Sequence, residues 1–174
     1  MKPDAPVHRR AHTLSWRWPD PPLRIVLVEP EIPPNTGNIA RLCAATGTPL
    51  HLIEPLGFQL TDRAVRRAGL DYWNAVTLFR HRNFEEFLAD VHPPRCFFFS
   101  VAAARACHAV AFAPGDALVF GSESRGLDDE LLARHAGHVV GLPMRPGAVR
   151  SLNLAHAAGI ALYEALRQFQ HTAS

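Results

Sequence analysis

The sequence predicts an α/β protein in which a parallel sheet is covered by helices on both faces. Short, fully apolar runs recur along the chain, as is typical of strands that are buried on both sides. Segments with helical spacing and capping signals separate these runs. Strands that alternate with helices in this way favour a parallel sheet, because each helix returns the chain to the same edge. We therefore expect one domain over residues 24–170, after a flexible N-terminal tail at residues 1–23.

The individual elements follow from local signals. Residues 24–28 and 50–53 are apolar runs that predict strands. Between them, Asn35 is a candidate N-cap for a helix that Gly47 ends. Thr61 is a candidate N-cap for a short basic helix. Further strands are expected at residues 75–78, 96–100, 117–120 and 138–142, and further helices at 84–91 after an Asn83 cap, at 127–134, and after a Ser151 cap.

Composition is that of a soluble globular protein. Hydrophobic residues make up 48% of the chain and charged residues 20%. No apolar run reaches the length of a membrane span, and the N-terminus lacks the pattern of a secretory signal, so we expect a cytoplasmic protein without a membrane segment. Cys43, Cys96 and Cys107 form no CxxC pair and are expected to be reduced thiols.

The charge of the chain gives little information about partners. The net charge of +2 arises entirely within residues 1–23, and the rest of the chain is neutral. Of the 18 cationic residues, all but Lys2 are arginines. Arginine is the better bidentate ligand for phosphate, although genome base composition produces the same bias.

Three unusual segments follow predicted strands, at residues 29–41, 120–127 and 142–154. Ligands of open parallel sheets bind beyond the carboxyl ends of strands, so these segments are candidates for a site. The chain has no GxxxxGK[ST] motif and no GxGxxG motif after the first strand, which disfavours the common nucleotide sites. His135 and His138 lack an HExxH motif or a third ligand, so we expect no metal.

Together the three segments resemble the SPOUT class of RNA methyltransferases, in its SpoU family. The resemblance spans residues 24–169 and rests on N-T-G-N-x-x-R, F-G-x-E-x-R-G-L and L-P-M…S-L-N-L, in that order. The phrases P-E-I-P-P-N-T-G-N and R-R-A-G-L-D-Y are similar to its short, TrmL-like subgroup. The resemblance implies a C-terminal deep trefoil knot, the SPOUT α/β knot. It also implies a homodimer whose two active sites are each completed across the interface.

The activity that this resemblance implies is 2′-O-methylation of tRNA at the wobble nucleotide, position 34, a cytidine or modified uridine, in leucine tRNAs. S-adenosyl-L-methionine would be the methyl donor and S-adenosyl-L-homocysteine the product. The donor is a reactive sulfonium that needs no metal, whereas a ribose hydroxyl is a poor nucleophile at neutral pH. Positioning can supply roughly 7–11 kcal/mol of such a barrier, and a general base contributes about 10²–10⁴-fold.

On the acceptor side the resemblance points to Arg41, which would bind the phosphate beside the target ribose and promote deprotonation of its hydroxyl. Asn35 is a further candidate catalytic residue and is expected to cap the same helix, whose N-terminus would favour anions. Tyr163 is linked to activity or to the dimer in the subgroup, with half-buried packing as an equal alternative. Further RNA contacts are expected from Arg66, Arg67, Arg125 and Arg150.

On the cofactor side the resemblance implies contacts at five positions: Phe99, Gly121, Leu142, Met144 and Ser151. For Phe99 and Leu142 the alternative is simple core packing, and for Ser151 it is helix capping. Gly121 would let the main chain approach the ligand closely.

Two further motif residues are expected to be structural. Glu123 would form an ion pair with Arg125 that shapes the pocket, and Asn153 would tie the loops of the knot together through its amide. Three other functions stay open: methylation at another tRNA or rRNA position, a non-catalytic RNA-binding or assembly factor with this fold, and an ordinary doubly wound nucleotide-binding enzyme.

Overall fold

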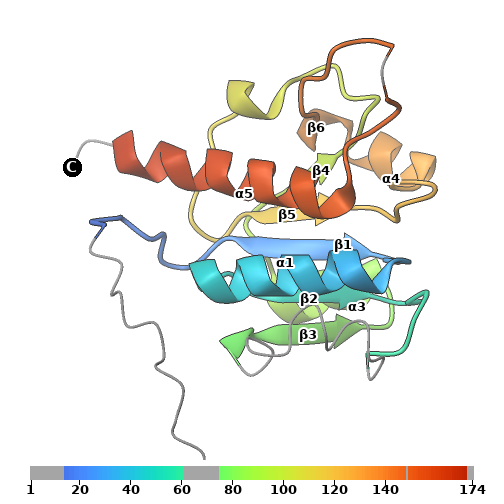
Figure 1. Cartoon of the computed structure of the whole chain (residues 1–174), viewed down its shortest axis with the longest axis horizontal. Helices are drawn as coiled ribbons and strands as arrows, with labels where there is room; N and C mark the ends of the chain where they lie inside the picture. The colour runs from blue at the N-terminus through green and yellow to red at the C-terminus, as the bar shows by residue number, and fades with distance from the viewer. Residues whose placement is uncertain (1–13, 61–74, 148, 172–174) are drawn as a thin grey trace, which may run out of the picture.

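The computed structural model describes residues 14–60, 75–147 and 149–171. Within these ranges six strands form one parallel sheet in the order β3-β2-β1-β5-β4-β6 (Figure 1). The predicted α/β architecture is therefore confirmed. The strands are β1 Arg24–Val28, β2 Leu50–Ile53, β3 Leu78–His81, β4 Cys96–Phe99, β5 Ala117–Phe120 and β6 Val139–Val140.

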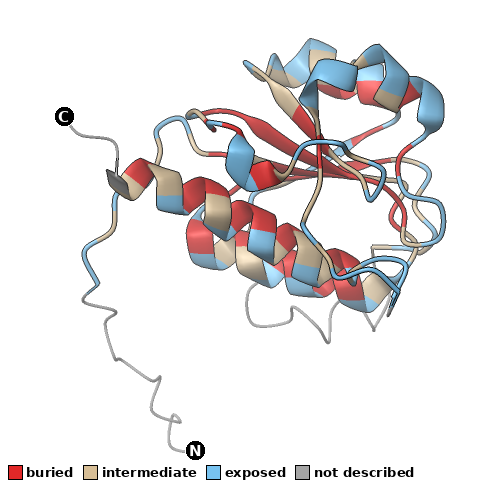
Figure 2. Cartoon of the chain, turned by 90° about the horizontal axis from the view of Figure 1, so that it is seen from above, coloured by how far each residue is buried: buried red, intermediate tan, exposed pale blue. Residues whose placement is uncertain are grey.

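Helices cover both faces of the sheet, and their buried sides form two separate cores. Helices α1 and α5 share one core with the sheet, and α3 and α4 share the other. Figure 2 shows each long helix with a buried side and an exposed side. The helices are α1 Pro33–Thr46, α3 Phe84–Val91, α4 Asp129–Arg134 and α5 Leu154–His171, with short 3-10 turns η2 at Cys107–Ala109 and η3 at Ala136–His138.

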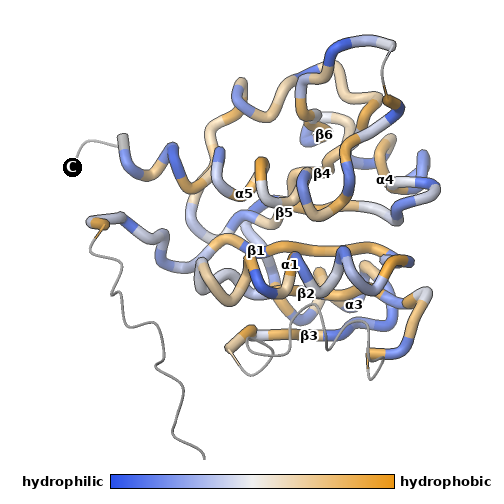
Figure 3. The backbone as a smooth tube through the Cα atoms, in the orientation of Figure 1, coloured by the Kyte–Doolittle hydropathy of each residue, from blue (hydrophilic) through white to orange (hydrophobic). Residues whose placement is uncertain are grey.

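The central strands β1 and β5 are apolar apart from Arg24, because alternate residues enter different cores. In β5, Leu118 and Phe120 pack with α1 and α5, whereas Ala117 and Val119 pack with α3 and α4. Figure 3 shows the same property for β1, which is coloured as hydrophobic along most of its length. The continuous apolar runs in the sequence are explained by this burial on two sides.

The predicted limits of β3 and α1 are wrong for identifiable reasons. The strand expected at 75–78 is found at Leu78–His81, at the edge of the sheet. Phe79 and Arg80 are exposed there, so an edge strand does not need the apolar run that we looked for. Helix α1 begins at Pro33, before Asn35, because proline is well suited to the first helical position, where its missing N–H is not needed.

Other caps agree with the sequence or shift by a few residues. Asn83 caps α3, where its side chain accepts a hydrogen bond from the Glu86 amide, and Gly47 ends α1 with a φ of 65°. The last helix begins at Leu154, with Asn153 accepting bonds from the next turn, so the predicted Ser151 cap is wrong. Asp128 caps α4, which starts two residues later than expected, and the helix predicted after Thr61 lies outside the described residues.

The N-terminal segment attaches to the end of α5. Trp16 packs against the core that α1 and α5 share. The backbone N–H of Arg17 donates to Gln170 Oε1 at 2.9 Å, and the Gln170 side-chain amide donates back to the Arg17 carbonyl at 2.9 Å. Residues before position 24 therefore pack against the domain, although the sequence predicts a flexible tail there.

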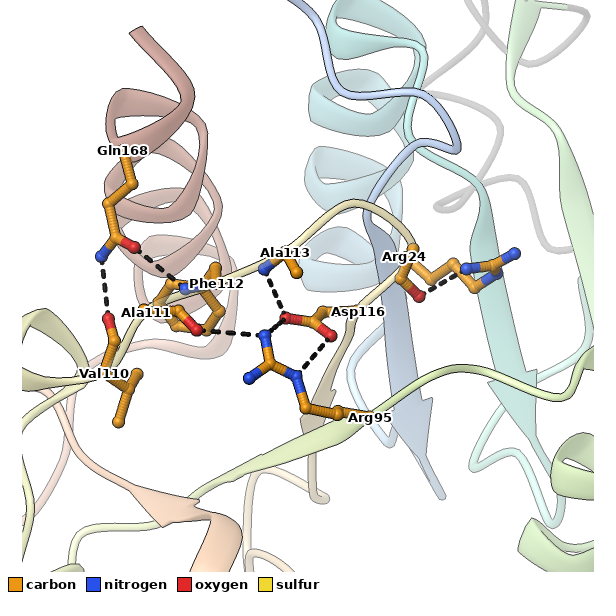
Figure 4. A network of polar contacts seen from close by, with 9 residues as sticks. Arg24, Arg95, Val110, Ala111, Phe112, Ala113, Asp116 and Gln168 are labelled. Atoms are coloured by element: carbon orange, nitrogen blue, oxygen red, sulfur yellow. Dashed lines mark hydrogen bonds and ion pairs between the residues drawn. The ribbon is translucent and has the colours of Figure 1, made fainter. Parts of the chain in front are cut away.

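A polar network fixes the end of the sheet where the strands begin (Figure 4). Asp116 is fully buried and accepts two hydrogen bonds from Arg95, at 2.6 and 3.0 Å, and one from the Ala113 amide at 2.7 Å. Gln168 of α5 accepts a bond from the Phe112 amide at 3.0 Å. These contacts hold the long connection into β5 against both the sheet and α5.

The loops that would form the predicted knot contact each other. The Gly141 amide donates to the Arg105 carbonyl at 2.9 Å, and the Cys107 amide donates to the Gly141 carbonyl at 2.8 Å. The connection after β4 and the connection after β6 are thus joined by backbone hydrogen bonds. The knot itself stays a prediction, which this contact supports.

Candidate active site

A cavity of about 570 Å³ lies at the carboxyl ends of the strands. Its volume falls within the range of roughly 300–1,000 Å³ that is usual for small-molecule sites. The order of the strands reverses between β1 and β5, which is where open α/β sheets bind ligands. Its walls come from the start of α1, from the segments that follow β4, β5 and β6, and from residues 150–154 and Ala157.

All five predicted cofactor residues line this cavity. Phe99 and Phe120, at the ends of adjacent strands, stack with ring centroids 4.7 Å apart and planes 17° apart. Half-buried Leu142 lies beside them in the lining. The result is an apolar surface surrounded by backbone groups of the neighbouring loops, an arrangement suited to a flat ring with polar substituents. The five residues are Phe99, Gly121, Leu142, Met144 and Ser151.

Gly121 is required because another part of the chain packs against it, whereas the sequence predicts a close approach by the ligand. A Cβ atom at this position would lie 2.0 Å from the carbonyl carbon of Gly126 and 2.2 Å from the amide nitrogen of Leu127. The turn between them is closed by hydrogen bonds in both directions between Ser122 and Gly126, whose φ is 75°. The glycine therefore lets the chain pack against itself, which sets the shape of the cavity wall.

Glu123 forms hydrogen bonds with the residues that lead into helix α1. Its carboxylate accepts hydrogen bonds from the backbone amides of Glu31 and Ile32, at 2.8 and 3.2 Å. It also accepts one from the Asn35 side-chain amide at 2.9 Å. A carboxylate beside the first turn of a helix is favourable for the helix dipole. The N-cap residue of α1, Ile32, makes no side-chain hydrogen bond to the helix. Glu123 therefore caps the start of α1 from another segment of the chain.

The predicted ion pair between Glu123 and Arg125 is wrong. Arg125 pairs instead with Glu29, at 2.8 Å between Nη2 and Oε2, because Glu123 is already used by backbone amides. Arg125 is 73% exposed and lines the cavity at its rim, as does exposed Arg150. Their contact with RNA stays a prediction. The other two predicted RNA contacts, Arg66 and Arg67, lie outside the described residues.

Asn35 joins two of the motif segments. Its side chain is 6% exposed, donates to Glu123 and accepts a hydrogen bond from Asn153 Nδ2 at 2.9 Å. The Asn153 oxygen meanwhile caps α5. The structural role predicted for Asn153 agrees with these bonds, whereas Asn35 acts as a tie between loops instead of a helix cap.

Two predicted catalytic residues lie outside this cavity. Arg41 is exposed on α1, eight residues after Pro33 and thus roughly 12 Å along the helix, so the argument from the helix N-terminus fails. Tyr163 is 49% exposed on α5 and does not line the cavity either. Neither side chain belongs to the cavity lining, and the catalytic roles of both stay predictions.

The charges near the cavity are few. Among the described lining residues, the ionisable side chains are Glu123, Arg125, Asp129 and Arg150. Behind the wall, hydrogen bonds from the hydroxyl and backbone N–H of Ser124 lower the pKa of Glu31. The described part of the chain contains no cluster of three or more residues suited to hold a metal. None of its helices has the length and apolar character needed to cross a membrane.

Sequence reasoning missed several residues of the wall. Phe120 is the last residue of a predicted strand. The alternation of side chains along that strand is the signal that could have identified it. Ser122 and Ser124 occupy the two variable positions of the F-G-x-E-x-R-G-L motif, so the motif predicts no role for them. Val101, in the connection after β4, carries no motif, so nothing in the sequence marked it.

Comparisons with known proteins identify the family of the chain. Residues 22–163 match a model of the SpoU rRNA Methylase family. The chain is 52% identical over 147 residues to the tRNA (cytidine(34)-2′-O)-methyltransferase of Burkholderia pseudomallei (strain 1106a), covering 83% of this chain and 94% of that protein.

Two solved structures are also similar. One, described as giving structural insights into the 2-OH methylation of C/U34 on tRNA, has a TM-score of 0.80 and 50% identity, covering 85% of this chain and 96% of that one. The other is an AdoMet-bound rRNA methyltransferase from Sinorhizobium meliloti. It has a TM-score of 0.74 and 28% identity, covering 87% of this chain and 57% of that one.

Proposed function

Because the chain belongs to the SpoU rRNA methylase family, we propose that it methylates the ribose 2′-hydroxyl of nucleotide 34 in tRNA, using S-adenosyl-L-methionine. The observation that carries the proposal is the cavity at the switch point of the sheet, which all five predicted cofactor residues line. The choice of nucleotide 34 rests on the 52% identity to a tRNA (cytidine(34)-2′-O)-methyltransferase. Leucine tRNAs are the expected substrates.

The residues of the cavity fit the proposed donor. The stacked Phe99 and Phe120 rings give an apolar surface for an adenine, and backbone groups around Gly121 and Leu142 are available for polar contacts. Ser151 is exposed and also lines the cavity, where it can bind a polar end of the ligand. When bound, S-adenosyl-L-methionine supplies an activated methyl group on a sulfonium. The cavity then holds that group in a fixed direction while its apolar lining limits the access of water.

The acceptor is oriented by arginines. Arg125 and Arg150 at the rim can bind phosphates on the RNA backbone and so fix the target ribose above the cavity. Their guanidinium groups are planar and suited to bidentate phosphate contacts. Arg41 is assigned the phosphate beside the target ribose, where its positive charge favours loss of the hydroxyl proton.

The proposal includes a homodimer, because Arg41 lies outside the cavity of its own chain. Helices α1 and α5 pack side by side, and α5 exposes two large hydrophobic side chains, Ile160 at 50% and Tyr163 at 49%. Exposed apolar residues at helical spacing are suited to a second helix. A partner packed on this surface would bring its own α1, with the partner's Arg41, toward the cavity.

Methyl transfer into tRNA tests the proposed activity. Purified protein is incubated with labelled S-adenosyl-L-methionine and total tRNA from a strain that lacks the protein, and the product is mapped by mass spectrometry of nuclease fragments. We expect one 2′-O-methyl group at nucleotide 34, in leucine tRNAs. A methyl group at another position would support the alternative substrates, and no transfer, together with no donor binding, would support a non-catalytic role.

A further inference from the structure

We propose that Glu31, which does not line the cavity, is a positioning residue for the methyl donor and acts through Ser124. The inference rests on the proposed function, since it assumes that the cavity holds the donor. Both carboxylate oxygens of Glu31 are used by Ser124. The backbone N–H of Ser124 donates to Oε2 at 3.0 Å, and its hydroxyl donates to Oε1 at 2.7 Å.

This contact is one half of a reciprocal clasp between two loops. The clasp consists of Glu31 and Ile32 before α1, and Glu123 and Ser124 after β5. Glu123 accepts from the backbone amides of Glu31 and Ile32, and Glu31 accepts from the backbone amide of Ser124. Each loop therefore gives a carboxylate to the backbone of the other. Two ties in opposite senses fix both the separation of the loops and their relative rotation, which a single tie would leave free.

The clasp controls a wall of the cavity. Residues 122–126 form the turn that lines it, and Ser124 lies in the middle of that turn. One side of the turn is already fixed by the close packing of Gly121 on Gly126. Glu31 fixes the other side from outside the cavity. The hydrogen bonds from Ser124 lower the pKa of Glu31, so its carboxylate is ionised at neutral pH and the bonds are charge-assisted.

Loss of the Glu31 contact should act mainly on the donor. Arg125, the next residue of the turn, keeps a separate tie to Glu29. We therefore expect weaker donor binding, with the turnover rate at saturating donor almost unchanged.

The test compares Glu31→Ala, Ser124→Ala and the double variant in the full-length protein. S-adenosyl-L-homocysteine binding is measured by calorimetry, and KM for the donor and kcat by methyl transfer into tRNA. We expect Glu31→Ala to raise Kd and KM by roughly 5- to 30-fold, which is less than two buried hydrogen bonds to a charged group would give, because both bonds are exposed to solvent. The double variant should be no worse than Glu31→Ala, because both changes break the same contact. Glu31→Gln, which keeps one acceptor oxygen, should recover part of the affinity.

Glu54→Ala is the matched control. It also removes a glutamate from a loop beyond a strand and breaks an ion pair, with Arg80, but it does so away from the cavity. Its Kd should equal that of the wild type. The inference is overturned if Glu31→Ala binds S-adenosyl-L-homocysteine normally, or if the two single effects multiply in the double variant. Absence of binding by the wild type would instead overturn the proposed function itself.

Should Glu31→Ala fail to fold, Ser124→Ala decides the question. It removes only the hydroxyl of an exposed residue and leaves the backbone bond to Glu31 in place. We expect it to raise Kd by a smaller factor than Glu31→Ala, with an unchanged melting temperature in the absence of ligand. A Ser124→Ala protein with wild-type Kd would contradict the clasp.

Discussion

At the scale of single residues, the cavity is shaped by close packing of the backbone. Gly121 has no space for a side chain, because the carbonyl of Gly126 and the amide of Leu127 occupy the position of its Cβ. From the sequence, glycines in this motif indicated a close approach, but the partner in that approach was taken to be the ligand. The folded turn shows that the partner in this close approach is the chain itself, at Gly126 and Leu127.

The first prediction concerns this glycine. Gly121→Ala must displace the turn at 122–126, so we expect it to destabilise the protein by about 1–3 kcal/mol and to weaken S-adenosyl-L-homocysteine binding by at least tenfold. Urea unfolding and calorimetry measure the two effects. Gly137→Ala is the control, since nothing lies within 4 Å of its Cβ position. Normal ligand affinity in Gly121→Ala would contradict the role given to this packing.

A buried histidine pair predicts how stability depends on pH. His51 is 2% exposed, packs between the rings of Phe79 and Phe87, and lies 3.1 Å from His81 between Nδ1 and Nε2. Burial lowers the pKa of His51 to about 3, with further contributions from the charges of His81 and Arg24. The unfolded chain, with an ordinary pKa near 6.5, binds this proton first. The folded state is therefore destabilised as pH falls from about 6.5 toward 3.

The second prediction follows from this sign. Between pH 7 and pH 5, His51 should remove about 2 kcal/mol from the free energy of unfolding. His51→Gln keeps a polar partner for His81 without the titration, so its unfolding free energy should fall less over the same interval. Chemical denaturation at the two pH values gives the comparison. Equal pH dependence in both proteins would show that His51 does not contribute.

At the scale of elements, the interior strands and the edge strand differ in how well the sequence predicts them. β1, β2 and β5 are apolar apart from Arg24 and His51 because both of their faces are buried, so their limits follow from the sequence. β3 has a mixed pattern because Phe79 and Arg80 face solvent, and its position depends on pairing with β2. Some helices begin at a residue that is stabilised by a distant segment, as Glu123 does for α1. Local sequence signals cannot predict where such a helix begins.

The third prediction concerns the network at the start of the strands. Asp116→Asn keeps the shape of the side chain but removes the charge that pairs with Arg95. We expect a loss of about 2–3 kcal/mol in the free energy of unfolding, which is below the roughly 3–5 kcal/mol of a fully buried pair because Arg95 is 37% exposed. Arg134→Ala, which breaks an exposed contact of 3.8 Å with Glu85, should change stability by no more than about 0.5 kcal/mol. Equal effects of the two changes would contradict the role given to the network.

At the scale of the whole molecule, the fold brings together segments that are far apart in the chain. The loop after β1 and the turn after β5 are about 90 residues apart, yet β1 and β5 are neighbours in the sheet. The order of the three motifs indicated that they form one site. Their mutual contacts, including the tie from Asn35 to Asn153, could not be predicted, because they depend on how the loops pack beyond the strands.

The fourth prediction tests the dimer. Arg41→Ala leaves the cavity intact, and Gly121→Ala damages the cavity but leaves Arg41, so each protein alone should have little activity. If each cavity uses the partner's Arg41, a mixture that exchanges subunits should recover activity, because the mixed dimer contains one complete site. Methyl transfer into tRNA measures the recovery. A mixture as inactive as its parts, after exchange is confirmed, would place Arg41 and the cavity of one chain in the same site.

The central claim is that the cavity beyond β5 holds the methyl donor. A crystal structure of the protein with S-adenosyl-L-homocysteine tests this claim most directly. We predict the ligand within the cavity, in contact with Phe99, Gly121 and Leu142, with the bonds between Glu31 and Ser124 intact. The ligand bound at any other part of the chain would contradict the account.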